Sequence, residues 1–419
     1  MLKEFNEKDY IGKFDKQRGV TIDLIKTLTV DDMNIQTEEF VSPTKWHLAH
    51  TTWFFEKVIL EKFSKNYISY NKKYTDIFNS YYQSYGNPLP RNKRKLLSRP
   101  SVEEILDYRK EINKRILNLL NTKVIKNNKF IFLLNVGINH EQQHQELILM
   151  DILNVFFNNP LKPLFNKTVK SKFSKKNHKL NEEFFFFENI NFNTIGSVND
   201  DFCFDNELPA FKIQIRPFEI SRSCVTNLQW KEFIKSGGYN NSKIWLSDGF
   251  DFIKKKKINK PMYWLDENYY FSLNGVRKII DDSPVTNISF YEADAYARWR
   301  GKRLPTEIEL EALLGRQKVQ GNFLNKKIFE PLNLFDDGDV KNLFGNVWEW
   351  TSSAYLPYQS YKPWEDELAE YNGKFMCNQI VLKGGSCFTP HSHIRSSYRN
   401  FFYPSDRWAC NGFRLASKS

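Results

Sequence analysis

Apolar side chains recur at steps of three and four residues through residues 1–160, which predicts helices. Residues 44–63 carry this pattern in tryptophan, phenylalanine and histidine, and residues 101–120 carry it after a Ser-x-x-Glu capping box. Two further helices are expected over residues 130–157 and 21–28. Four amphipathic helices joined by loops predict a four-helix bundle, a fold whose metal sites form in the core between facing helices.

The pattern changes in the second half of the chain. Short alternating runs such as "FKIQIRPFEI" predict strands, and the few helices include two that open with capping boxes at Ser289 and Thr306. Between the halves lies a polar, lysine-rich stretch. We therefore predict a helical domain over 1–160, a linker over 161–184 and an α+β domain over 185–419.

Composition narrows the class of protein. The 419 residues are 41% hydrophobic and 16% aromatic, which is enough for sizeable cores. The net charge of +12 comes from scattered lysines, and the densest basic run, 166–179, has few aromatic residues, so no nucleic-acid partner is expected. No apolar run approaches the roughly 18 residues of a membrane span, and the charged amino terminus lacks a secretory core. Five cysteines without C-x-x-C spacing predict neither a disulfide framework nor a thiolate zinc site, so we expect a cytoplasmic protein with no membrane partner.

Histidines supply the candidate chemistry. His140 and His144 stand four residues apart in "NHEQQHQELILMDIL", so they share one helix face and can bind one ion. With Glu141 they form an H-E-x-x-H pattern, which is typical of zinc proteases. A third ligand is needed, and His50 and His47 are both candidates that periodicity does not separate.

The residues alone leave three interpretations open. Hydrogen-bonded core histidines need no metal at all. A zinc hydrolase needs Glu141 as general base and a ligand further downstream, where Glu182 and Glu183 fall in the predicted linker. Three neutral imidazoles from two helices suit zinc, iron or copper equally.

Several longer stretches resemble a known family. The amino-terminal half resembles the DinB-like domain of ergothioneine-biosynthesis sulfoxide synthases in "SPTKWHLAHTTWFFEKVIL", "FNSYYQSYGNPLPRNKRKLLSRPSVEEILDYR" and the histidine motif above. The second half resembles the formylglycine-generating-enzyme (sulfatase-modifying factor) domain, with its C-type-lectin-like fold, in "SPVTNISFYEADAYARWRGKRLPTEIELEALL", "LFGNVWEWTSS", "LKGGSCF" and "RNFFYPSDRWACNGFRLA". The resemblance spans nearly the whole chain.

This resemblance implies a mononuclear non-haem Fe(II) enzyme that uses O₂ as co-substrate. The family joins a cysteine-type thiol to the imidazole C2 of hercynine, a trimethylated histidine, and forms a sulfoxide. Matched to this chain, the iron ligands are His50, His140 and His144. Glu141 then becomes a structural residue rather than a base.

The resemblance also implies roles around the iron. Tyr81 and Tyr82 match a tyrosine pair that supplies a proton or an electron as oxygen is reduced. Gln143 matches a residue whose amide contacts the substrate imidazole. Arg91 and Arg94 match arginines that face the carboxylate of the thiol substrate, a group that guanidinium binds well.

In the second domain, Asn400, Phe401 and Phe402 match a segment that lines the substrate pocket in the family. Phe402 and Asp406 stand where the branch that uses γ-glutamylcysteine has an acidic residue and an arginine, which favours cysteine as the thiol. An aromatic face also suits a trimethylammonium group. The segment after "GGS" has Cys387 without the nearby second cysteine that formylglycine-generating enzymes use, so this domain is predicted to be a substrate wall.

Alternatives remain at the level of substrates and class. An ovothiol-type enzyme would join histidine to cysteine, and a selenoneine-type enzyme would join hercynine to a selenosugar. From other classes, a zinc hydrolase and a non-catalytic binding module are retained.

Overall fold

The computed structural model divides the chain into two compact units. Unit 1 comprises Met1–Phe165 together with Glu365–Glu370, and unit 2 comprises Asn166–Trp364 together with Tyr371–Ser419. The structure describes residues 7–166, 183–188, 191–198, 202–332 and 338–418. Most of the predicted linker, 161–184, and of the basic run within it lies outside the described residues.

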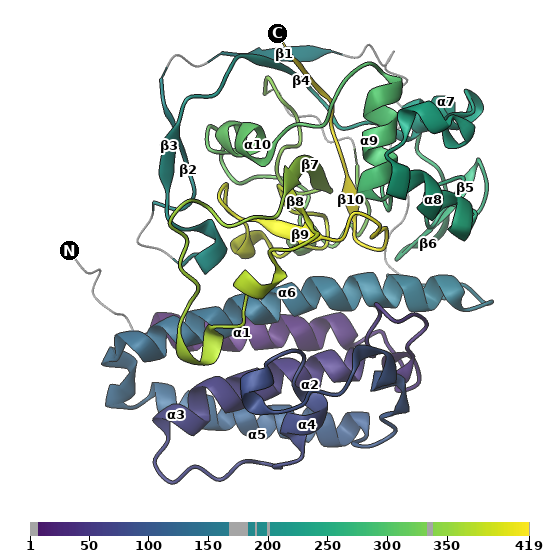
Figure 1. The fold of residues 1–419 in the computed structure, drawn as a ribbon. Helices are drawn as coiled ribbons and strands as arrows, with labels where there is room; N and C mark the ends of the chain where they lie inside the picture. Colours follow the sequence, from purple (N-terminus) through teal and green to yellow (C-terminus); the bar gives the residue numbers. More distant parts are fainter. Residues whose placement is uncertain (1–6, 167–182, 189–190, 199–201, 333–337, 419) are drawn as a thin grey trace. The chain divides into compact units, whose positions relative to one another are not determined.

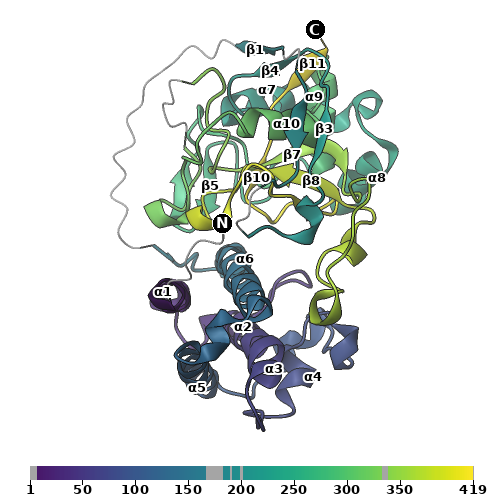
Figure 2. The same cartoon turned by 90° about the vertical axis from the view of Figure 1, so that its left-hand side faces the viewer.

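Unit 1 is a bundle of four long helices, shown side by side in Figure 1 and viewed close to their axes in Figure 2. The helices are α1 (Glu7–Ile25), α2 (Thr44–Phe55), α5 (Val102–Leu120) and α6 (Asn128–Asn158). A π-helical turn, η2 (Glu56–Leu60), and α3 (Glu61–Phe63) continue α2, and the short α4 (Tyr74–Phe78) follows it. The predicted bundle is confirmed, although its first helix begins well before residue 21.

Local sequence explains how these helices start and pack. At the start of α5 the Ser101 hydroxyl accepts from the Glu104 N–H at 3.1 Å, and the Glu104 carboxylate accepts from the Ser101 N–H at 2.6 Å. This is the predicted capping box. In α6, Gly137 packs against Phe55 of α2, where a Cβ would lie 2.6 Å from the ring. The missing side chain therefore lets the two helices approach closely.

Unit 2 combines short strands and short helices. One sheet has the order β1 (Phe184–Phe187), β4 (Phe218–Ser221), β11 (Ala416–Lys418), all antiparallel. A second has the order β10 (Asn411–Gly412), β7 (Trp348–Ala354), β8 (Ile380–Lys383), β9 (Asn400–Phe402), in which β10 and β7 are parallel. The described residues also form two two-stranded antiparallel sheets: β2 (Asn193–Ile195) with β3 (Phe211–Ile213), and β5 (Tyr269–Ser272) with β6 (Gly275–Lys278).

The α-helices in the described part of unit 2 are α7 (Asn227–Lys235), α8 (Ser247–Lys256), α9 (Phe290–Trp299) and α10 (Glu307–Leu314). Capping boxes at Ser289 and Thr306 open α9 and α10, as predicted. The alternating run "FKIQIRPFEI" forms two strands in different sheets, β3 and β4, rather than one. Pro217 stands at the break and has no N–H to donate to a ladder. Across the described ranges, none of the helices is both long and apolar enough to cross a membrane.

Candidate metal centre

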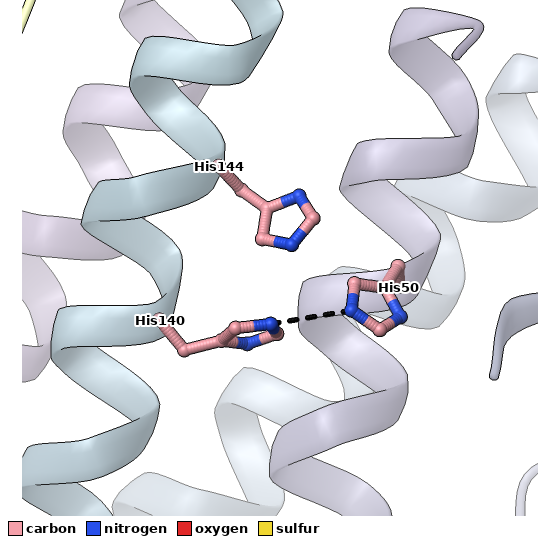
Figure 3. A group of neighbouring side chains, drawn as sticks. All are labelled: His50, His140 and His144. Atoms are coloured by element: carbon pink, nitrogen blue, oxygen red, sulfur yellow. Dashed lines mark hydrogen bonds between the residues drawn. The ribbon is translucent and has the colours of Figure 1, made fainter. Parts of the chain in front are cut away.

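Three histidines of unit 1 converge in the bundle core. His50 comes from α2, and His140 and His144 come from successive turns of α6 (Figure 3). One nitrogen from each ring lies within 4.8 Å of the other two, and the Nε2 atoms of His50 and His140 are 3.2 Å apart. All three side chains are buried. The structure therefore brings together the three residues that the family resemblance singled out.

The protonation of these rings suits metal binding. Burial lowers the pKa of His140 to about 3 and lowers the pKa of His50 and of His144 well below the ordinary value. The rings are therefore neutral near pH 7. The Nδ1–H of His50 donates to the Phe78 carbonyl oxygen at 2.5 Å, which leaves its Nε2 with a lone pair pointing toward His140.

The donor set fits a single ion. A neutral ring that faces another nitrogen at 3.2 Å is well placed to share a cation with it, since metal–imidazole bonds are about 2.0–2.1 Å long. Three imidazoles without a carboxylate suit a borderline metal such as Fe(II), Zn(II) or Cu(II). Three protein ligands also leave coordination positions for other molecules.

Aromatic rings enclose the histidines. Trp46 stacks on His50 with ring centroids 4.6 Å apart, and Trp53 covers it at 5.7 Å. Phe54 packs against His140 with centroids 4.4 Å apart. These rings exclude water and fix the imidazole planes, which explains why the pKa values fall so far.

The two predicted tyrosines lie next to this aromatic wall. Tyr82 is fully buried, with its ring 6.0 Å from Trp53 and 6.3 Å from Phe54. Tyr81 is partly exposed and stacks on Tyr82 with centroids 4.5 Å apart. The Tyr81 hydroxyl donates to the Tyr82 hydroxyl oxygen at 3.3 Å. Tyr82 is therefore the inner member of the pair.

The loop that carries the two tyrosines, residues 79–84, is held by Asn79 and Glu370, which the sequence did not suggest. The Asn79 side chain accepts from the Tyr82 N–H at 3.0 Å and donates to the Tyr82 carbonyl at 2.8 Å. The Glu370 carboxylate accepts from the N–H groups of Gln83 and Ser84 at 3.1 and 2.9 Å. Glu370 belongs to the short segment of the second half of the chain that forms part of unit 1, and no local pattern predicts its contact.

The two predicted arginines differ sharply. Arg94 is 3% exposed, its guanidinium carbon lies 3.3 Å from the centroid of the Trp46 ring, and it donates to the Ser42 hydroxyl at 2.7 Å. Its Nε has no hydrogen-bond partner among the residues that the structure describes, and burial holds its pKa well below the usual value. Arg91 is exposed and donates to the Phe40 carbonyl at 3.3 Å. Arg94 is thus a buried cation in a stack that leads through Trp46 to His50.

The Glu141 carboxylate is bound by other side chains and is not available as a general base. Its carboxylate is 2.6 Å from Arg18 and 2.5 Å from Arg109, and it also accepts from the Thr21 hydroxyl at 2.5 Å. Burial alone would raise its pKa, but the charges of Arg109 and Arg18 outweigh that effect and lower the pKa to about 2. A carboxylate so fully engaged cannot take a proton from water near neutral pH. This geometry argues against the zinc hydrolase alternative.

His47, the competing third ligand, lies outside the cluster of three. Its two ring nitrogens each lie 2.8 Å from a partner, one on His144 and one on Asp151. Gln143 is partly exposed on α6, one position before His144.

The predicted substrate-wall residues belong to unit 2. Asn400, Phe401 and Phe402 form β9, and all three are partly exposed. Phe401 stacks on Tyr355 with centroids 4.1 Å apart, and Phe402 packs edge-on against Trp408 at 5.2 Å.

Cys387 has a neighbour that sequence spacing could not reveal. Its sulfur lies 3.7 Å from that of Cys410, and both side chains are buried. The two cysteines stand 23 positions apart, unlike a pair within one short segment.

Comparison with known proteins defines the class. The profile of the sulfatase-modifying factor enzyme 1-like domain matches residues 187–333 and 325–419, more than half of the chain, and that of the DinB superfamily matches residues 13–148. The chain belongs to the sulfatase-modifying factor family and carries a DinB-like bundle amino-terminal to that domain in the sequence.

The chain is also similar in sequence to individual proteins of known function. It is 30% identical to the hercynine oxygenase of Mycolicibacterium smegmatis over 250 residues, which are 53% of this chain and 58% of that protein. It is 30% identical to the hercynine oxygenase of Mycobacterium tuberculosis over 246 residues, 53% of this chain and 57% of that protein. It is 27% identical to the formylglycine-generating enzyme of Streptomyces coelicolor over 260 residues, 51% of this chain and 76% of that protein. The matches thus span a little over half the length of the hercynine oxygenases, and together with the domain pair they confirm the resemblance to the sulfoxide synthase family.

Proposed function

We propose that the protein is an Fe(II)- and O₂-dependent sulfoxide synthase that joins the sulfur of cysteine to the imidazole C2 of hercynine. The observation that carries this proposal is the convergence of three neutral imidazoles in the DinB-like bundle of a chain similar to hercynine oxygenases. The reaction balances as one thiol, one imidazole C–H and one O₂ giving one sulfoxide and one water. Both substrates together supply the four electrons, so no external reductant is needed.

In this proposal His50, His140 and His144 hold the iron. A ferrous ion held there would supply the one-electron chemistry with O₂ and positions for sulfur and imidazole. The chain supplies the rigid frame: the α6 pair fixes two ligands one turn apart, and the Phe78 carbonyl orients the third through His50 Nδ1–H.

Arg94 is proposed to bind the carboxylate of cysteine. A buried guanidinium needs an anion, because an uncompensated charge in a low-dielectric interior is costly. Arg94 forms no ion pair with any carboxylate of the described residues, and its Nε lacks a partner. The exposed Arg91, three positions earlier, would add positive electrostatic potential near Arg94.

Tyr82 is proposed as the proton donor when oxygen is reduced. It is buried beside Trp53 and Phe54, and its oxygen accepts a hydrogen bond from the Tyr81 hydroxyl. Tyr81 would support this role from the outer side.

Two groups of residues, one in each unit, are proposed to take part in substrate binding. We propose that the Gln143 amide binds the imidazole of hercynine, since it can both donate and accept. In unit 2, Asn400, Phe401 and Phe402 are proposed as substrate-binding residues, and the aromatic faces of the two phenylalanines suit a trimethylammonium group. Phe402 and Asp406 at the positions described above favour cysteine over γ-glutamylcysteine.

Product analysis tests the proposal. The full-length protein is loaded anaerobically with Fe(II), given O₂, and supplied with hercynine or histidine, each with cysteine, γ-glutamylcysteine or a selenosugar. Mass spectrometry should detect a sulfoxide with hercynine and cysteine. A product only from histidine would instead define an ovothiol-type enzyme, and one only from the selenosugar a selenoneine-type enzyme. Peptidase activity with bound zinc and no sulfoxide would overturn the proposal.

A further inference from the structure

We propose that Asp151 and His47 form a two-step hydrogen-bond relay that fixes the tautomer of His144 and so directs its Nε2 lone pair to the candidate metal centre. The inference rests on the proposed function in one respect, that His144 is a metal ligand. The tautomer itself is a property of the metal-free chain.

The relay is continuous and buried. Asp151 lies on α6, two turns after His144, and its Oδ2 is 2.8 Å from His47 Nε2. The same oxygen accepts from the Ser42 N–H at 2.8 Å. His47 lies on α2, and its Nδ1 is 2.8 Å from His144 Nδ1. Asp151 and His47 are each 3% exposed and His144 is 8% exposed, so water does not compete for these contacts.

Elementary donor and acceptor rules then assign each proton. A carboxylate can only accept, so the nitrogen of His47 that faces Asp151 must carry a hydrogen. A neutral imidazole has one N–H, which leaves Nδ1 of His47 as an acceptor. His144 must therefore donate from its own Nδ1, and its Nε2 is left with the lone pair.

The same device appears on the other helix in a simpler form. His50 donates from Nδ1 to the Phe78 carbonyl, which likewise frees its Nε2. Metal-bound histidines generally donate their second N–H to a carboxylate or carbonyl, and loss of that partner typically weakens metal affinity by about 10–100-fold. For His144 the corresponding partner is a second imidazole, that of His47, which is in turn hydrogen-bonded to the Asp151 carboxylate.

This arrangement makes His47 a positioning residue. Both of its nitrogens are engaged, one with Asp151 and one with His144, so it offers no lone pair to an ion. It also gives His47, one turn before His50, a role of its own, which the periodicity of the sequence did not distinguish from that of a ligand.

The first test reads the tautomer directly. The full-length protein is labelled with ¹⁵N-histidine and kept metal-free, and its long-range ¹H–¹⁵N correlations are recorded, with His144 assigned by its loss in His144→Gln. The relay predicts a protonated Nδ1 and an unprotonated Nε2 on His144. The opposite tautomer would overturn it, and this outcome does not depend on whether the protein is a sulfoxide synthase.

The second test reads metal affinity by anaerobic competition with a chelator. His47→Leu should weaken Fe(II) binding about 10–100-fold, whereas His47→Asn should lose less than about tenfold because its amide oxygen replaces Nδ1 as the acceptor. Asp151→Leu added to His47→Leu should weaken binding little further, because Asp151 reaches His144 only through His47. Circular dichroism and thermal unfolding check that each variant folds.

The outcomes separate the two claims. Unchanged iron affinity in His47→Leu would overturn the positioning role, even with the predicted tautomer. A wild-type protein that has the predicted tautomer but binds no iron would instead remove the proposed function and leave the relay standing.

Discussion

The Nε2 atoms of His50 and His140 lie 3.2 Å apart, although 90 positions separate the two residues in the chain. The contact exists because α2 and α6 approach closely at Gly137, which stands one turn before His140 and faces the Phe55 ring. The distance between α2 and α6 therefore determines the distance between the ring nitrogens of His50 and His140. That link makes the metal centre testable through residues that do not touch it.

Gly137→Ala should impair both stability and metal binding. The new Cβ would lie 2.6 Å from Phe55, whose ring is already packed edge-on against Phe14. Such overpacking typically destabilises by about 1–3 kcal/mol. Thermal unfolding and iron content are the measurements. Gly12→Ala in α1 is the matched control and should be neutral or slightly stabilising, because its added Cβ would approach no side chain of the described residues within 4 Å. Equal behaviour of the two variants would contradict this account of the helix contact.

Glu141→Gln should destabilise the fold. The substitution leaves the Arg18 and Arg109 guanidinium groups buried without their counter-charge, a change that costs about 3–5 kcal/mol. Chemical denaturation measures the loss. A zinc hydrolase predicts the reverse pattern, with stability kept and peptidase activity abolished.

The sequence predicted the elements whose signals are local. The capping boxes at Ser101, Ser289 and Thr306 each mark a helix start, and the apolar spacing marks α2 and α6. The predicted first helix is too short, because the buried stripe of α1 includes the polar Arg18 and Thr21, which interrupt its apolar spacing. One alternating run was split between two sheets at Pro217, which periodicity alone does not reveal.

Within the candidate centre, the sequence predicted residues but not their partners. The family resemblance singled out His50 over His47, and only three-dimensional packing shows that His47 joins His144 to Asp151. The contacts of Asn79 and Glu370 with the tyrosine loop involve single polar side chains without a spacing pattern. Such contacts depend on where the chain returns, which hydrophobic periodicity does not encode.

Arg94→Ala should raise the KM for cysteine strongly, while Arg91→Ala should raise it little. A charge-assisted hydrogen bond from a buried donor contributes about 1.5–3 kcal/mol, which corresponds to roughly 10–150-fold in KM. Only Arg94 is buried, so only its interaction escapes screening by solvent. Steady-state kinetics with varied cysteine at saturating hercynine measures the effect. Equal losses in the two variants would indicate that general positive charge, rather than a specific contact, attracts the thiol.

Tyr82→Phe should change the product rather than abolish oxygen consumption. Without the phenolic proton, sulfoxide formation should fall by about 100-fold, the lower end of general-acid catalysis, and more cysteine should leave as its sulfinate. Tyr81→Phe is the control. This variant keeps the Tyr82 hydroxyl and loses the hydrogen bond that the Tyr81 hydroxyl donates to it, so it should shift the product ratio less. Mass spectrometry of both products gives the ratio. If it is unchanged in Tyr82→Phe, this tyrosine takes no part in the chemistry.

The most direct test of the account is metal stoichiometry in protein purified without oxygen and reconstituted with Fe(II). Three histidines from two helices predict one iron per chain in the wild type, with His50→Ala, His140→Ala and His144→Ala each losing it while the bundle stays folded by circular dichroism. Full iron retention in any of these three variants would contradict the assignment. So would a wild-type chain that keeps one zinc and takes up no iron.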